Sequence, residues 1–160
     1  MTDQSGFAAT ADVQDLQEEL APGTPLCNGQ YVIDRYLNSG GFGITYLARD
    51  SLDRKVVIKE CFPNALCGRL GHRVHLRSRS CAEDFGRAVE FFGKEATALA
   101  RLNHPNIVGV HQIFHENNTA YMALDFIRGA DLLDVLEQEP ERLTPAFVDT
   151  LLRSLLRALG

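Results

Sequence analysis

A glycine-rich segment, and a lysine on the β-forming run that follows it, are the residues best suited to chemistry. The segment is Asn38-Ser39-Gly40-Gly41-Phe42-Gly43, and Lys59 closes the apolar run Val56-Val57-Ile58. Glycine backbones can lay unhindered N–H groups over phosphates, and a lysine on the neighbouring strand can bring one cation to them. A dinucleotide fingerprint would need a helix after the glycines, but residues 44–48 favour a strand, and the chain has no P-loop Gly-Lys-Ser/Thr. A glycine hairpin clamped over phosphates remains, beside the alternative of an ordinary hairpin turn whose glycines supply positive φ.

Glu95 is the candidate partner for Lys59. In an alternating strand Lys59 shares a face with Val57, so its ammonium would lie on the inner face of a sheet, where an unpaired charge costs several kcal/mol. Glu95 lies three residues after Phe92 and four before Leu99, so it shares the inward face of a predicted helix. We therefore predict a Lys59–Glu95 ion pair that holds the lysine extended. The alternative for Glu95 is a solvated residue at the edge of the apolar stripe.

Five β-forming runs and three helical patterns must position these residues. Strands are expected from β-branched and aromatic content at residues 31–37, 44–50, 55–62, 107–115 and 119–126. Helices are expected from Glu83 or Asp84 to about residue 102, over residues 132–138, and from Thr144 or Pro145 to the end. The first three strands are joined too closely for helical crossovers, which predicts an antiparallel meander. Backbone groups near Gly129, past the last strand, could bind the edge of a flat heterocycle; a core strand leading to a turn is the alternative.

In this order the segments resemble the N-terminal lobe of the bacterial Hanks-type (eukaryotic-like) serine/threonine protein kinases. The resemblance runs from Tyr31 to Gly160 and rests on the glycine-rich segment, Val-Val-Ile-Lys, Lys94-Glu95-Ala96 and the segments 104–108 and 121–132. It implies an α+β fold: a five-stranded antiparallel sheet with one regulatory helix, followed by the first helices of an incomplete helical C-terminal lobe. We expect a disordered acidic leader over residues 1–30, the kinase N-terminal lobe with its ATP-binding loop over residues 31–127, and the hinge exit and start of a truncated C-terminal lobe over residues 128–160.

The resemblance also implies an ATP site. The residues that would cover the phosphates are Gly40, Gly41, Phe42 and Gly43. Lys59 would pair with the α- and β-phosphates, and Glu95 would orient Lys59. The adenine edge would meet the backbone of Asp125 and Ile127, Asp131 would face the ribose, and the residues lining the adenine slot would be Leu37, Thr45, Val57 and the gatekeeper Leu124. Asn38 stands where the first loop glycine is expected, while Val57 and Thr45 replace an alanine and a valine, so we expect a reduced affinity for the nucleotide.

The residues that complete catalysis in this family would all follow Gly160: the catalytic aspartate, a metal-binding asparagine and the Asp-Phe-Gly metal ligand. Asp84-Phe85-Gly86 has the same letters but lies upstream, at the start of a predicted helix, so we do not assign it as the metal motif. We assign no catalytic base and no metal ligand; ATP is the expected cofactor, with Mg²⁺ and a protein substrate bound only with the missing C-terminal lobe. The expected function is the ATP-binding part of a serine/threonine kinase, inactive alone because half a cleft cannot position the reaction. The alternative is a non-catalytic, pseudokinase-like interaction module.

Composition excludes several other classes. A net charge of −5 over 160 residues argues against nucleic-acid binding, and no apolar run approaches the ~20 residues of a membrane span. The four cysteines show no CxxC pair and no metal-ligand spacing, as expected for reduced thiols in a cytoplasmic protein. The basic insert at residues 69–79 could meet an acidic partner, although a solvated loop is the simpler interpretation.

Overall fold

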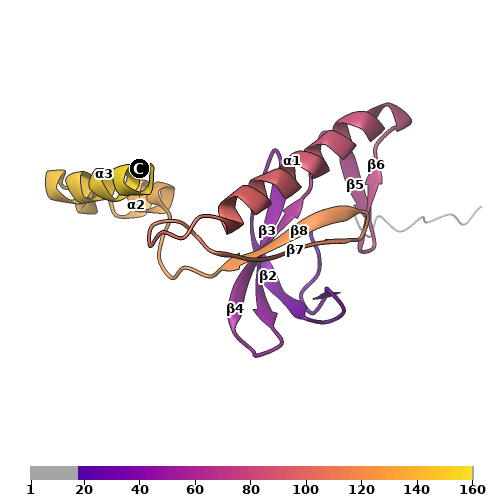
Figure 1. The fold of residues 1–160 in the computed structure, drawn as a ribbon, viewed down its shortest axis with the longest axis horizontal. Coiled ribbons are helices and arrows are strands. Elements are labelled where there is room, and N and C mark those ends of the chain that lie inside the picture. Colours follow the sequence, from indigo (N-terminus) through magenta and orange to yellow (C-terminus); the bar gives the residue numbers. More distant parts are fainter. Residues whose placement is uncertain (1–17, 160) are drawn as a thin grey trace, which may run out of the picture.

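A curled antiparallel sheet with one long helix across it forms the main body of the computed structural model, which describes residues 18–159 (Figure 1). The sheet has the strand order β1-β2-β3-β4-β8-β7. Its strands are β1 (Pro25–Leu26), β2 (Tyr31–Gly40), β3 (Gly43–Asp50), β4 (Lys55–Cys61), β7 (Val110–Glu116) and β8 (Thr119–Asp125). A separate hairpin is formed by β5 (Cys67–Leu70) and β6 (Arg73–Leu76), and the helices are α1 (Ala82–Ala100), α2 (Leu132–Gln138) and α3 (Pro145–Leu159).

The expected α+β class and the five expected strands are confirmed. Strands β2, β3 and β4 form the predicted meander, and β8 pairs with both β4 and β7. The sheet has one strand more than the expected five, because the two-residue strand β1 pairs with the start of β2. A strand of two residues is too short to show the alternation of apolar and polar side chains by which strands are predicted from a sequence.

Alternation along β4 gives the sheet two buried faces. Val56, Ile58 and Glu60 point into the curl of the sheet, whereas Lys59 and Cys61 point toward α1. The core inside the curl is the larger one, and α1 covers the second core through the buried side chains of Phe92 and Ala96. Lys59 therefore lies at the margin of the core that α1 closes.

The helices begin and end close to their expected positions. Helix α1 starts at Ala82 after a 3₁₀ turn over Arg79–Cys81, so Glu83 and Asp84 lie in its first turn and do not cap it. Helix α2 covers the expected residues. Helix α3 starts at Pro145, and the N–H of Phe147 donates to Oγ1 of Thr144, 3.2 Å away, as expected of a threonine cap.

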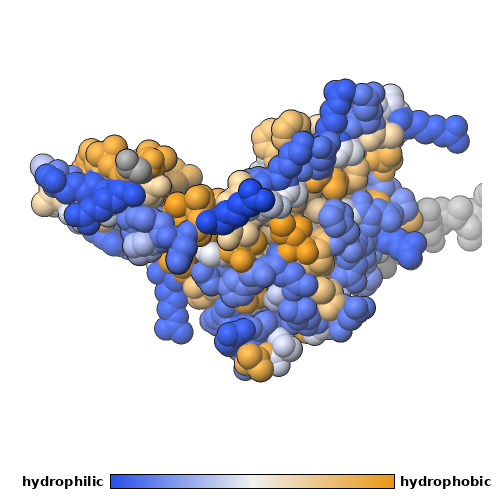
Figure 2. Space-filling view, viewed as in Figure 1, coloured by the Kyte–Doolittle hydropathy of each residue, from blue (hydrophilic) through white to orange (hydrophobic). Residues whose placement is uncertain are grey.

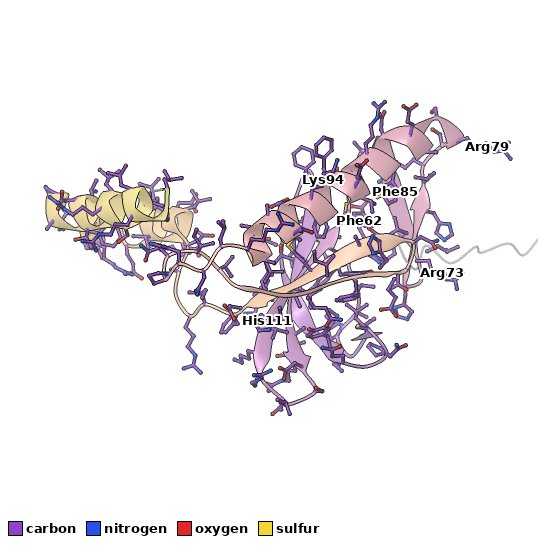
Figure 3. All side chains as sticks on the ribbon, in the orientation of Figure 1. Phe62, Arg73, Arg79, Phe85, Lys94 and His111 are labelled. Carbon is purple, nitrogen blue, oxygen red and sulfur yellow. The ribbon has the colours of Figure 1, made fainter. Side chains whose placement is uncertain are left out.

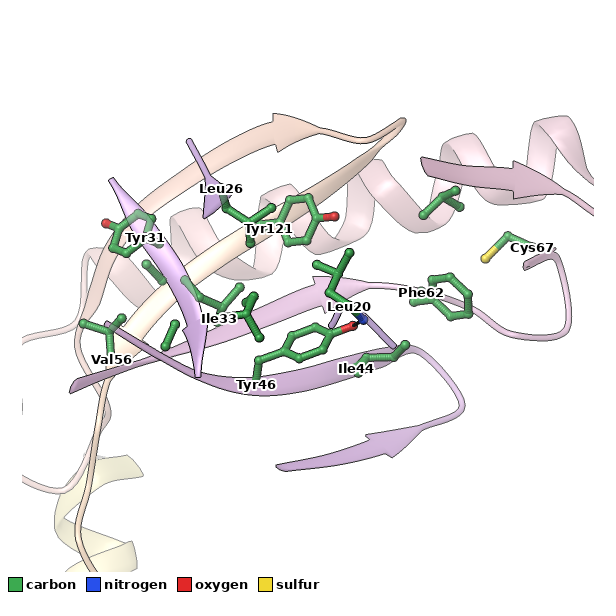
Figure 4. Close-up of a cluster of buried hydrophobic side chains, with 14 residues drawn as sticks. Leu20, Leu26, Tyr31, Ile33, Ile44, Tyr46, Val56, Phe62, Cys67 and Tyr121 are labelled. Carbon is green, nitrogen blue, oxygen red and sulfur yellow. Dashed lines mark hydrogen bonds between the residues drawn. The ribbon is translucent and has the colours of Figure 1, made fainter. Parts of the chain in front are cut away.

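Residues 18–30 correct the expectation of a disordered leader over residues 1–30. Leu20 and Leu26 are buried in the main core, with 2% and 0% of their surface exposed. The N–H of Leu20 donates to the hydroxyl of Tyr46 at 3.1 Å (Figure 4). Two isolated leucines in a polar segment form no periodic pattern, so their burial could not be predicted from the sequence. They are buried because the curl of the sheet leaves space for them in the core. Residues 1–17, the rest of the expected leader, lie outside the described residues.

The basic insert is not a solvated loop but a hairpin docked on the sheet. Arg69 on β5 has only 2% of its side chain exposed, and its Nη2 lies 2.6 Å from Oε2 of the buried Glu60. Arg77 binds Oε1 of Glu18 at 2.8 Å. Arg73 and Arg79 extend from the end of the molecule where β6 meets the start of α1 (Figure 3). Two of the four arginines thus hold the hairpin and the N-terminal segment together.

Helices α2 and α3 lie beyond the C-terminal end of α1 (Figure 1). The amide of Asn106, in the connection after α1, donates to the carbonyl of Ser154 at 2.8 Å and ties α3 to it. Four leucines of α3 are largely exposed: Leu152, Leu155, Leu156 and Leu159. Figure 2 shows hydrophobic surface over this helix. Among the described residues, none of the helices combines the length and the apolar character that crossing a membrane requires.

Candidate nucleotide-binding site

The glycine-rich segment is the hairpin between β2 and β3. Gly40 and Gly43 face each other across it, with Gly41 and Phe42 at the tip. None of the three glycines has φ in the left-handed region, so turn geometry does not require them. A Cβ on Gly43 would overlap the carbonyl oxygen of Glu60, which explains that glycine by packing. A Cβ on Gly40 or Gly41 would meet no atom within 4 Å, so these two leave open space where backbone can approach a ligand.

Lys59 and Glu95 form the predicted ion pair, with 3.3 Å between Nζ and Oε1. The two side chains are 35% and 52% exposed, so the pair lies at an open margin and not on a closed inner face. An ion pair exposed to this degree contributes little to stability. The Nζ also lies 5.9 Å from the centre of the Phe92 ring, which helps to place it on the α1 side of the sheet. The arrangement holds a cation in place and leaves it accessible.

A hollow of about 250 Å³ adjoins this pair. It lies between the hairpin tip, β4 and α1, and it is lined by Phe42, Lys59, Cys61, Ala88, Phe91, Phe92 and Glu95. No motif or spacing in the sequence singled out Cys61, Ala88 or Phe91 as neighbours of Lys59. Phe42 is 84% exposed at the tip, so it is the part of the lining least held by the protein.

The strand register brings the expected adenine-slot residues onto the face that carries Lys59. Thr45 lies opposite Lys59 on β3, and Asn38 lies opposite Thr45 on β2. Val57 lies opposite Leu124 on β8. Leu37 sits in an irregularity of β2 between Tyr36 and Asn38 and is half-buried. These side chains line the sheet beside the hollow described above and are not part of its lining.

The expected hinge follows β8. Asp125 is the last residue of that strand, and Ile127, two residues beyond it, is 70% exposed. Asp131 caps helix α2: its Oδ1 accepts the N–H of Asp134 at 2.8 Å, so the carboxylate has a structural role whatever else it binds. Residues 18–159 contain no group of three His, Cys, Asp or Glu side chains placed to hold a metal ion.

Two buried thiols should resist alkylation: Cys61, which lines the hollow, and Cys67, on β5 in the main core. Burial raises the pKa of Cys61 to about 11 and that of Cys67 to about 12, so both stay protonated at pH 8. We expect iodoacetamide to modify Cys61 and Cys67 about a hundredfold more slowly than the partly exposed Cys27 and Cys81, measured by mass spectrometry of the native chain. Equal labelling of all four cysteines would contradict this difference in alkylation rate.

The free energy of unfolding should also fall as the pH rises from 9 toward 11, because the unfolded thiols lose protons that the folded ones keep.

Comparison with solved structures shows which fold the chain has. The chain superposes on PpkA-294 in its apo form with a TM-score of 0.79 and 32% identity, over 83% of this chain and 47% of that one. The kinase domain of PknI from Mycobacterium tuberculosis shows the same fold, with a TM-score of 0.61 and 23% identity over 88% of this chain and 50% of that one. The curled sheet with its single crossing helix has the fold of the N-terminal lobe of a protein kinase.

The curated relatives that the chain matches are serine/threonine protein kinases. The chain is 32% identical over 142 residues to the serine/threonine-protein kinase pkn2 of Myxococcus xanthus, and 32% identical over 122 residues to PknJ of Mycobacterium tuberculosis. These matches cover 88% and 76% of this chain but only 15% and 18% of the two kinases. No protein-family model matches the chain. The chain is a homologue of the Hanks-type serine/threonine protein kinases, and it spans less than a fifth of the length of these two relatives.

Proposed function

We propose that the chain is the ATP-binding part of a serine/threonine protein kinase. The observation that carries the proposal is the Lys59–Glu95 ion pair beside a hairpin with two glycines that neither turn geometry nor packing requires. A ligand that approaches the backbone at Gly40 and Gly41 and presents negative charge to Lys59 accounts for both features.

In this proposal each part of the site has one task. The hairpin N–H groups at Gly40, Gly41 and Phe42 bind phosphate oxygens, Lys59 neutralises the α- and β-phosphates, and Glu95 keeps Lys59 directed toward them. The backbone of Asp125 and Ile127 receives the adenine edge, and Asp131 faces the ribose. The resulting chemistry is transfer of the γ-phosphate to a serine or threonine of a protein substrate in the cytoplasm. A C-terminal lobe supplies the catalytic base, the ligands that bind Mg²⁺ and the contacts with the protein substrate.

Replacing Lys59 with alanine should weaken ATP binding about 10- to 100-fold, because a hydrogen bond to a charged group contributes about 1.5–3 kcal/mol. We expect weak binding by the wild-type chain, and calorimetry of the chain with ATP would measure both affinities. Lys94→Ala is the matched control, because Lys94 lies on α1, pairs with Glu90 and is not among the residues that line the hollow. The free energy of unfolding should change by less than about 1 kcal/mol in either variant. An unchanged affinity in Lys59→Ala, or a sub-micromolar affinity in the wild type, would contradict the proposal.

The exposed apolar face of α3 favours a second candidate, a non-catalytic module that binds another protein. The two candidates differ in nucleotide binding. Two results together would favour the interaction module. The folded wild-type chain would show no affinity for ATP, and it would bind a protein partner that the Leu152→Glu variant does not bind.

A further inference from the structure

We infer that His111 is a positioning residue for the proposed adenine-binding backbone, acting through the carboxylate of Asp125. The inference rests on the proposed function and adds to it a residue that contacts no nucleotide. His111 Nε2 lies 2.6 Å from Asp125 Oδ1. We call His111, Gly109 and Asp125 the hinge clamp.

A β-bulge directs His111 to this contact. In the β7–β8 ladder Val110 lies opposite Leu124 and Gln112 lies opposite Ala123, so His111 is an extra residue without a partner in the register. A bulge turns a side chain away from the direction that simple alternation would give it, and bulges are common beside functional sites. The bulge lies beside Leu124, the last residue but one of β8, and Figure 3 shows His111 near this end of the strand.

Gly109 completes the clamp. Its N–H donates to Oδ2 of Asp125 at 3.1 Å, and its carbonyl accepts the N–H of Asp125 at 3.0 Å. A Cβ at residue 109 would overlap Asp125 Oδ2, so only glycine lets the carboxylate approach this backbone. The His111 hydrogen bond and, to a smaller extent, the Gly109 N–H keep the pKa of Asp125 below its usual value.

The clamp fixes the residue from which the proposed adenine contacts begin. Both carboxylate oxygens and the N–H of Asp125 are bound to the segment 109–111, while Ile127, two residues further on, is exposed and makes no comparable contact. Backbone groups that bind a heterocycle must be held within a fraction of an ångström of their working positions. The side chain of Asp125 supplies that restraint through its hydrogen bonds to residues 109 and 111.

Amide hydrogen exchange of the ligand-free chain tests the clamp itself. His111→Ala should speed exchange of the Asp125 amide at least about tenfold, because one charge-assisted hydrogen bond is lost. His111→Gln, whose amide can donate to the same carboxylate, should restore much of the protection. His115→Ala is the control on the same strand, since His115 is also exposed and lies outside the clamp. An Asp125 amide that exchanges equally fast in wild type and His111→Ala would overturn the inference.

Titration with adenosine and with inorganic triphosphate tests the role in binding. His111→Ala should weaken adenosine binding about tenfold and leave triphosphate binding unchanged, whereas Lys59→Ala should do the reverse. Equal adenosine affinity in His111→Ala and wild type would overturn the positioning role even if the amide exchanges faster. If the wild-type chain binds neither probe, the proposed function is wrong, and His111 has no role in adenine binding. The hydrogen-exchange experiment would then still show whether the hinge clamp holds Asp125.

Discussion

Arg69→Ala should lower the free energy of unfolding by about 3–5 kcal/mol, because it leaves a buried carboxylate without its counter-charge. Glu60 is fully buried and accepts hydrogen bonds from Tyr46 at 2.9 Å, Tyr121 at 2.8 Å and Arg69 at 2.6 Å. Burial and the nearby Glu60 raise the pKa of both tyrosines, so their hydroxyls stay protonated and continue to donate. Two neutral donors remain in the variant, but no positive charge remains beside Glu60.

The guanidinium of Arg69 also joins two other segments. Its Nε donates to the carbonyl of Glu18 at 2.6 Å, and its Nη1 donates to the carbonyl of His72 at 3.0 Å. Urea denaturation followed by circular dichroism would measure the loss. Arg73→Ala, on the adjacent strand of the same hairpin and exposed, is the control and should change stability by no more than about 0.5 kcal/mol. A similarly small effect in Arg69→Ala would show that the hairpin does not dock as described.

Leu20→Ala should cost about 2–5 kcal/mol, the usual range for emptying a fully buried leucine site. Leu20 is 2% exposed and packs in the main core with residues such as Ile44 and Phe62 (Figure 4). A disordered leader would predict no effect, so this variant separates the two descriptions of the N-terminal segment.

Leu70→Ala is the matched control for Leu20→Ala, because Leu70 is 71% exposed at the end of β5. Its stability should stay within about 0.5 kcal/mol of wild type. Equal midpoints for the two variants in urea would exclude a structural role for Leu20. The backbone N–H of Leu20, which alanine keeps, donates to Tyr46, and Tyr46 donates to Glu60 on β4, so hydrogen bonds join the N-terminal segment to the strand that carries Lys59.

The features of this protein that the sequence alone determined depend on residues that lie close together in the chain. Alternation set the face of Lys59 on β4, and helical periodicity set the face of Glu95 on α1, so their pairing could be predicted although 36 positions separate them. The threonine-proline start of α3 and the glycine hairpin are local signals of the same kind. The five longer strands followed from such patterns, whereas the fold class followed from the resemblance of the ordered segments to a known family.

The tertiary structure decided what depends on contacts between distant segments. Arg69 looks like the other arginines of its segment, and only docking of the hairpin onto β4 and residue 18, which is 51 positions away, buries it. Leu20 and Leu26 become core residues because the curl of the sheet leaves space for them. His111 reaches Asp125 because a bulge changes its direction, and a bulge arises from pairing between strands, which no residue in one strand specifies.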